Sequence, residues 1–156
     1  MLIRKAEKKD IGDVIKLGID FLNYHKNFDP YFAPSNNIKN LYKKYFSKYL
    51  NSKNKLLLVA QQDDNIIGFA TADIQKGSEL FRIKLTGLIE YIFVTDGHRK
   101  QGIGDEFLKE VLKWFKIKKI KYITISVHSE NKIGRKAWRK YGFKEFIIRQ
   151  RIYLDK

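Results

Sequence analysis

The chain has 156 residues, no cysteine and a formal net charge of +15. The missing cysteines exclude disulfides, cysteine nucleophiles and thiolate metal sites, and a hydrophobic content of 44% excludes a disordered chain. No stretch approaches the roughly 18 consecutive apolar residues that cross a membrane, and the first residues lack the apolar core of an export signal. We therefore expect a cytoplasmic protein with no membrane span.

The positive charge attracts anions, among them nucleic acid, the ribosome, acidic proteins and phosphate-rich cofactors. The basic residues are spread along the whole chain and form no basic tail. Charge alone therefore leaves a lysine-rich solvated surface and a polyanion partner both open.

In chain order, residues 2–6 predict a short strand, and Asp10 offers an N-cap for the helix that follows. Apolar residues at helical spacing extend this helix to just before Asn27, where a loop with both prolines begins. A second helix is predicted over 37–50. Its apolar residues repeat every three or four positions: Ile38, Leu41, Tyr42, Tyr45, Phe46 and Tyr49.

The central part predicts three strands, over 55–61, 66–75 and within 83–94, joined by turn-forming residues. A glycine-bearing turn over 95–104 then leads into a helix with a clear apolar side.

The last part predicts a strand over 122–127, a helix over 131–141 closed by Gly142, and a final strand over 143–154. No repeat or linker interrupts the chain. We expect one mixed α/β domain spanning residues 1–156.

The turn is the most informative segment. Glycines that precede a helix free the backbone to bend around an anion, and the helix N-terminus presents unpaired N–H groups. Gly97 and Gly102 have the spacing of a phosphate-binding P-loop, but Ile103 and Gly104 replace its Lys and Ser/Thr. Phe107 occupies the third glycine position of a dinucleotide fingerprint. An anion site of another kind and an ordinary glycine turn both remain.

The segment Arg99-Lys100-Gln101-Gly102-Ile103-Gly104 matches the Arg/Gln-x-x-Gly-x-Gly/Ala signature of the GCN5-related N-acetyltransferase (GNAT) superfamily. Residues 89–94 resemble the fourth strand of those enzymes. Asn131 and the sequence Tyr141-Gly142-Phe143 resemble the start and end of their second motif, and the opening residues also fit. The resemblance covers nearly the whole chain.

This resemblance implies a GNAT-like fold: a central, mostly antiparallel sheet of about six strands, splayed between strands 4 and 5 and flanked by about four helices. It also implies acetyl-CoA as cosubstrate and no metal. Backbone groups of 92–94 would hold the pantetheine arm and the acetyl carbonyl, and N–H groups of 100–105 the pyrophosphate. The implied cofactor-binding residues are Ile92, Phe93, Val94, Arg99, Lys100, Gln101, Gly102, Ile103, Gly104, Asp105, Asn131, Gly134 and Trp138.

The implied reaction is direct attack of an amine on the thioester. A free alkylamine has a pKa near 10, so a base must remove its proton. If the strand is regular, Glu90 shares a face with Ile92 and Val94, where a carboxylate is costly unless it meets water or a ligand. Residues 88–94 also resemble the diamine (spermidine/spermine) acetyltransferase branch, which implies that Glu90 is the base. A surface glutamate is the alternative.

The acid that protonates the leaving thiolate departs from the family pattern. The position seven after Asn131 is usually tyrosine and here is Trp138, whose indole cannot supply a proton near neutral pH. Tyr141 could substitute if the helix shifts. Water, another tyrosine, or weak activity are the other readings.

The acceptor could be a small polyamine, another small amine, or a peptide or protein amine. The high positive charge argues against a polycation unless the pocket is locally acidic. Two other classes remain open: a basic module that binds nucleic acid or the ribosome, and a non-catalytic acetyl-CoA-binding protein. The sequence leaves the oligomeric state open, a homodimer included.

Overall fold

The computed structural model describes residues 1–154. These residues form two compact units, one ending at Ser126 and one beginning at Val127. The first unit contains the strands β1 (Leu2–Lys5), β2 (Lys55–Gln62), β3 (Asn65–Lys76), β4 (Leu85–Val94) and β5 (Ile123–Ile125). Its α-helices are α1 (Ile11–Lys26), α2 (Ile38–Leu50) and α3 (Ile103–Ile117). The second unit contains α4 (Lys132–Lys140). Helix lengths and order agree closely with the expected ones.

The five strands form one sheet in the order β1-β2-β3-β4-β5. The first three pairings are antiparallel, and β4 pairs with β5 in parallel. The mixed, mostly antiparallel sheet expected from the family resemblance is therefore confirmed, with five strands rather than about six.

The prediction of a strand over 143–154 is wrong, because the segment has no regular secondary structure. Its large apolar side chains are exposed: Phe146, Ile147, Ile148, Ile152, Tyr153 and Leu154. Aromatic and β-branched residues favour a strand only where a neighbouring strand gives them a surface to pack on. The sequence pattern shows this preference for a strand, but it does not show whether a neighbouring strand is there to pair with.

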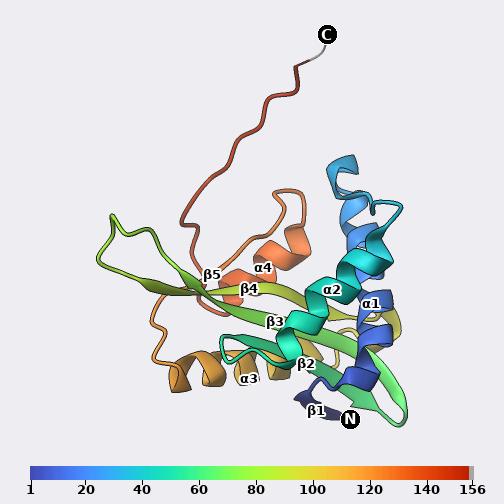
Figure 1. Ribbon diagram of the computed structural model, residues 1–156. Coiled ribbons are helices and arrows are strands. Elements are labelled where there is room, and N and C mark those ends of the chain that lie inside the picture. The colour runs from blue at the N-terminus through green and yellow to red at the C-terminus, as the bar shows by residue number, and fades with distance from the viewer. Residues whose placement is uncertain (155–156) are drawn as a thin grey trace. The chain divides into compact units, whose positions relative to one another are not determined.

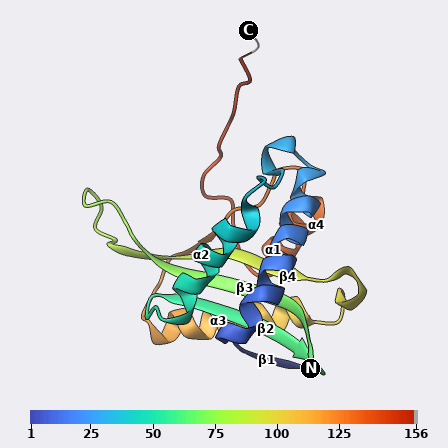
Figure 2. The same cartoon turned by 45° about the vertical axis from the view of Figure 1, so that its right-hand side comes forward.

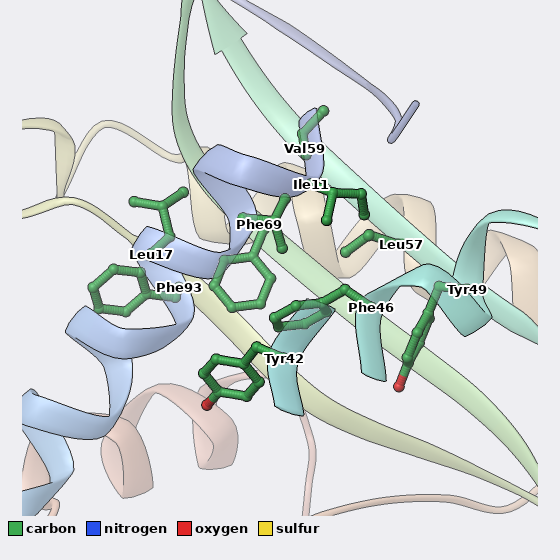
Figure 3. Packing of buried hydrophobic residues seen from close by; sticks show 10 residues of the cluster. Ile11, Leu17, Tyr42, Phe46, Tyr49, Leu57, Val59, Phe69 and Phe93 are labelled. Carbon is green, nitrogen blue, oxygen red and sulfur yellow. The ribbon is translucent and has the colours of Figure 1, made fainter. Parts of the chain in front are cut away.

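Helices α1 and α2 cover one face of the sheet and α3 covers the other (Figures 1 and 2). Between α1, α2 and the strands lies a core in which Val14, Phe46, Val59 and Phe69 are fully buried. Figure 3 shows Tyr42, Phe46 and Tyr49 projecting from α2 into this core. The aromatic stripe predicted on this helix is thus a packing face.

The two helices approach closely at Gly18. A Cβ built there would lie 2.9 Å from the ring of Tyr42. The Tyr42 hydroxyl also donates to the carbonyl of Gly18 over 3.3 Å. A larger residue would push α1 away from α2, so glycine sets the separation of the two helices.

The start of α1 is fixed by an ion pair. Arg4 on β1 donates to both carboxylate oxygens of Asp10, over 2.7 and 2.9 Å. Asp10 also accepts the backbone N–H of Glu7, and its side chain makes no capping bond to α1. The expected N-cap residue therefore holds the preceding strand instead. The hydrogen bond from Arg4 lowers the pKa of Asp10.

Candidate active site

The turn between β4 and α3 has the backbone of an anion-binding loop. Lys100 and Gly102 both adopt positive φ, at 62° and 81°. Left-handed residues turn successive N–H groups toward one side of the chain. The N–H groups of 100–104 have no backbone acceptor among residues 1–154. They meet the positive end of α3, so the turn fits a pyrophosphate.

Glycine at 102 is required by conformation and by access. A β-branched residue adopts its φ of 81° only at a cost. No atom lies within 4 Å of the place where a Cβ would sit. The space beside this backbone is open to a ligand.

Arg99 is held within the turn. Its Nε donates to the carbonyl of Val94 over 3.0 Å, and Nη1 pairs with Asp96 at 2.6 Å. Its guanidinium carbon lies 5.1 Å from the ring centroid of Tyr24 and 5.5 Å from that of Phe93. Arg99 therefore fixes the end of β4 against the turn. Its predicted contact with the cofactor stays a prediction.

The strands β4 and β5 separate where the family resemblance predicts. Their parallel pairing covers only Gly87 to Ile89 against residues 123–125. Beyond Ile89, β4 continues to Val94 and remains paired only with β3. The backbone edge of 90–94 that faces away from β3 thus lacks a strand partner among the described residues. Extended backbone of this kind suits the amide groups of a pantetheine arm.

Glu90 occupies a β-bulge. Thr71 on β3 pairs with Tyr91, whereas Ala72 pairs with Ile89, so Glu90 is the extra residue on β4. A bulge aims two consecutive side chains to the same side and reverses the alternation beyond it. The prediction that Glu90 shares a face with Ile92 and Val94 is therefore wrong, because it assumed a regular strand.

The bulge turns Glu90 toward α2. The hydroxyl of Tyr45 donates to its Oε2, and the ring of the next residue, Tyr91, lies 6.3 Å from that of Tyr45. Glu90 is nevertheless exposed. A carboxylate exposed on one side and hydrogen-bonded on the other can receive a proton from a ligand while it is held in place.

Around Glu90 the phenols are neutral. Burial raises the pKa of Tyr42, Tyr45, Tyr49 and Tyr91 above the ordinary range of a tyrosine. Tyr45 and Tyr49 share a hydrogen bond of 2.6 Å between their oxygens. The sequence predicted both residues as core aromatics and missed their hydroxyls. Two tyrosines four apart on a helix, facing a strand that carries a carboxylate, were the available signal.

In the second unit, Asn131 caps α4 by accepting the N–H of Gly134 over 2.9 Å. A Cβ at Gly134 would lie 2.8 Å from the Asn131 amide, so the glycine makes room for the cap. Trp138 packs on Tyr141 and Phe143, with ring centroids 5.9 and 5.3 Å away. The cofactor and acid roles of these residues stay predictions.

No group of three or more His, Asp or Glu side chains within residues 1–154 is arranged to hold a metal ion. Across the same range, no helix is both long enough and apolar enough to span a membrane.

The sheet splayed between β4 and β5, beside a turn that fits an anion, is the architecture that the family resemblance implied. Residues 21–143 match the family model "Acetyltransferase (GNAT) family". The chain belongs to this family and is an acetyl-CoA-dependent N-acetyltransferase.

Individual relatives agree. An uncharacterised N-acetyltransferase of Archaeoglobus fulgidus is 28% identical over 114 residues, which is 73% of each chain. The BH1408 protein of Bacillus halodurans has the same fold, with a TM-score of 0.86, 18% identity, and coverage of 99% of this chain and 100% of that one. A predicted acetyltransferase of Clostridium acetobutylicum, solved with acetyl-CoA, gives a TM-score of 0.76 at 21% identity, covering 97% and 95% of the two chains.

Proposed function

We propose that the enzyme acetylates a small primary amine, with Glu90 as the general base. The observation that carries this proposal is the position of Glu90. It is the first residue of β4 after the pairing with β5 ends at Ile89, and it is exposed and held by Tyr45. An amine that approaches the end of the pantetheine path therefore meets this carboxylate.

Acetyl-CoA supplies the acetyl group as a thioester. The backbone of 92–94 would orient its pantetheine arm, and the N–H groups of the turn from Lys100 would bind its phosphates. Glu90 accepts a proton from the amine, the amine nitrogen bonds to the acetyl carbon, and the carbon–sulfur bond breaks. Water then protonates the thiolate, whose ordinary pKa near 8.5 makes a protein acid helpful but dispensable.

The surroundings of Glu90 favour a small cationic amine. Tyrosine and phenylalanine rings line this side of β4, among them Phe21, Tyr45 and Tyr91. Aromatic faces and a carboxylate together suit an ammonium group on a short apolar body. The resemblance of residues 88–94 to the diamine acetyltransferases points to a polyamine such as spermidine, against which the overall charge of +15 acts.

The test is release of free CoA thiol from acetyl-CoA, followed against a panel of spermidine, monoamines and lysine-containing peptides. A small amine should be turned over with saturation, and Glu90→Gln should remove most of that rate while thermal stabilisation by acetyl-CoA is kept. Turnover of peptides alone would replace the small-amine acceptor. Full activity of Glu90→Gln would remove Glu90 as the base.

A further inference from the structure

A connected set of polar side chains lies beneath Glu90, between α2 and the sheet. Tyr45 and Tyr49 come from α2, Asp73 from β3 and Lys55 from β2. Alternation along β3 puts Asp73 on the same side as Phe69, whose ring packs on Phe46 of α2. These groups occupy the face covered by α2, away from α3.

This set has fewer hydroxyl protons than oxygen atoms that could accept a hydrogen bond from them. Tyr45 donates its one proton to Glu90, so Tyr49 must donate in the 2.6 Å contact between the two phenols. The carboxylate of Asp73 also acts on the Tyr49 hydroxyl, although no hydrogen bond joins that hydroxyl to Oδ1 of Asp73. Burial raises the pKa of Tyr49, and the carboxylate of Asp73 adds to this rise. Tyr49 cannot give one proton to both Tyr45 and Asp73.

Asp73 has one carboxylate oxygen with a partner and one without. The residue is 7% exposed, and its Oδ2 pairs with Lys55. Its Oδ1 is buried and has no hydrogen-bond partner among residues 1–154. A buried carboxylate oxygen without a donor is costly, and few native groups are left so. This set of side chains therefore leaves one buried carboxylate oxygen without a hydrogen-bond donor.

We propose that Tyr45 and Tyr49 are positioning residues that make Glu90 a better proton acceptor, because a proton taken up by Glu90 completes the chain to Asp73. Protonated Glu90 donates to the oxygen of Tyr45. The Tyr45 hydroxyl then rotates to donate to Tyr49, and the Tyr49 side chain shifts so that its hydroxyl donates to Oδ1 of Asp73. No phenol O–H bond breaks, and the proton from the amine remains on Glu90.

The meaning of this switch for catalysis rests on the proposed function, in which Glu90 takes the proton of the acceptor amine. Before transfer, Tyr45 holds the carboxylate in place. After transfer, the three hydrogen bonds and the newly satisfied Asp73 favour the protonated product of that step. The titratable and charged groups that face this cluster are Tyr42, Tyr45 and Tyr49 from α2, Tyr91 from β4, Asp73 from β3 and Lys55 from β2.

The test needs neither acetyl-CoA nor an amine. The full chain is labelled with ¹³C at the tyrosine Cζ and the glutamate Cδ, and is titrated by NMR under folding conditions, with signals assigned from single Tyr→Phe variants. The signals of Tyr45 and Tyr49 should both move with the midpoint of the Glu90 carboxyl. In Glu90→Gln neither should move at that midpoint. In Tyr45→Phe the Tyr49 signal should no longer follow Glu90.

Asp73→Asn separates the switch from a simple electric field. This variant removes the charged acceptor, so the response of Tyr49 to Glu90 should shrink. The proposal would be overturned if the Tyr49 signal did not shift at the Glu90 midpoint in the unmodified protein. It would also be overturned if that shift persisted in Tyr45→Phe. Either result concerns only the coupling between these side chains and does not bear on turnover. It can therefore be distinguished from a failure of the proposed function, which the turnover assay measures.

A kinetic arm uses the amine identified by turnover. Tyr49→Phe should lower kcat several-fold with little change in KM and should move the acid limb of the kcat/KM profile to lower pH, because Glu90 loses the network that favours its protonated form. Tyr42→Phe is the matched control: its hydroxyl bonds to Gly18 and lies 3.5 Å from Tyr91. Equal profiles for the two variants would contradict the chain.

Discussion

Arg99 stacks on Tyr24, with its guanidinium carbon 5.1 Å from the ring centroid. The contact joins the last turn of α1 to the turn that precedes α3. These two segments are 75 positions apart in the sequence, as the difference between 99 and 24 gives, and the stack places them side by side. The C-terminal end of α1 is thus held against the loop that fits the phosphates.

Replacing Tyr24 should weaken the contact between α1 and the turn before α3. Tyr24→Leu keeps an apolar side chain but removes the π-face, and we expect a loss of about 0.5 to 1 kcal/mol in the free energy of unfolding by urea. Tyr122→Leu is the control, since Tyr122 is an exposed tyrosine just before β5. Equal effects of the two substitutions would mean that the stack contributes nothing.

Gly102→Val should weaken acetyl-CoA binding about tenfold, because a β-branched residue at positive φ costs about 1 to 2 kcal/mol unless the N–H groups of the turn move. The measurement is the thermal shift caused by acetyl-CoA, relative to each variant's own melting temperature. Gly97→Ala is matched to it, since Gly97 lies in the same turn with open space at its Cβ. Unaltered affinity in Gly102→Val would remove the turn from the cofactor site.

Glu90→Gln should lower kcat/KM about 100-fold, a typical contribution of a general base. The loss should be greatest at low pH, where most of the amine is protonated and removal of its proton limits the rate. The amide keeps the size of the side chain and can still accept from Tyr45. A pH–rate profile with the same shape as that of the unmodified enzyme would show that another group removes the proton.

Two glycines of α1 should respond in opposite ways to alanine. Gly18→Ala introduces a Cβ 2.9 Å from the ring of Tyr42 and should destabilise the fold by about 1 to 2 kcal/mol. Gly12→Ala meets no atom within 4 Å and should stabilise it by about 0.5 to 1 kcal/mol through the loss of chain entropy. Urea unfolding measures both, and a destabilised Gly12→Ala would show that helix propensity is not the governing factor.

The pair of Arg4 and Asp10 should make stability depend on pH. The pKa of Asp10 is lowered by Arg4, so its contribution is complete above the unfolded-state value of about 3.9 and is lost as the pH falls through the lower folded value. Asp10→Asn should cost about 2 kcal/mol at pH 7 and less near pH 2. Asp13→Asn breaks only an exposed pair with Lys16 and should change little.

The features that were predictable follow from local chemistry. Gly102 at the start of α3 was recognisable from its place between a strand and an amphipathic helix, and it does adopt the left-handed conformation. Lys100 also adopts the left-handed conformation, and the residue type lysine does not predict it. The helices were predictable because their apolar stripes are long and regular.

The features that were not predictable depend on partners distant in the chain. The bulge at Glu90 is visible only when β4 is aligned on β3, because either strand alone appears regular. The hydroxyl pair of Tyr45 and Tyr49 was concealed by the same apolar spacing that made α2 predictable. Residues 143–154 have the composition of a strand. Composition does not show whether a sheet edge is available for them to pair with.

The extra residue in β4 puts two neighbouring side chains, those of Glu90 and Tyr91, on the side of the sheet that α2 covers. Before the bulge, Gly87 faces Phe115 of α3; after it, Tyr91 and Phe93 face α1 and α2. Deleting Glu90 would leave Ile89 and Tyr91 as neighbours on a regular strand, so the residues beyond would keep their present faces and only the carboxylate would be lost. The bulge therefore adds one polar side chain to a strand whose packing does not depend on it.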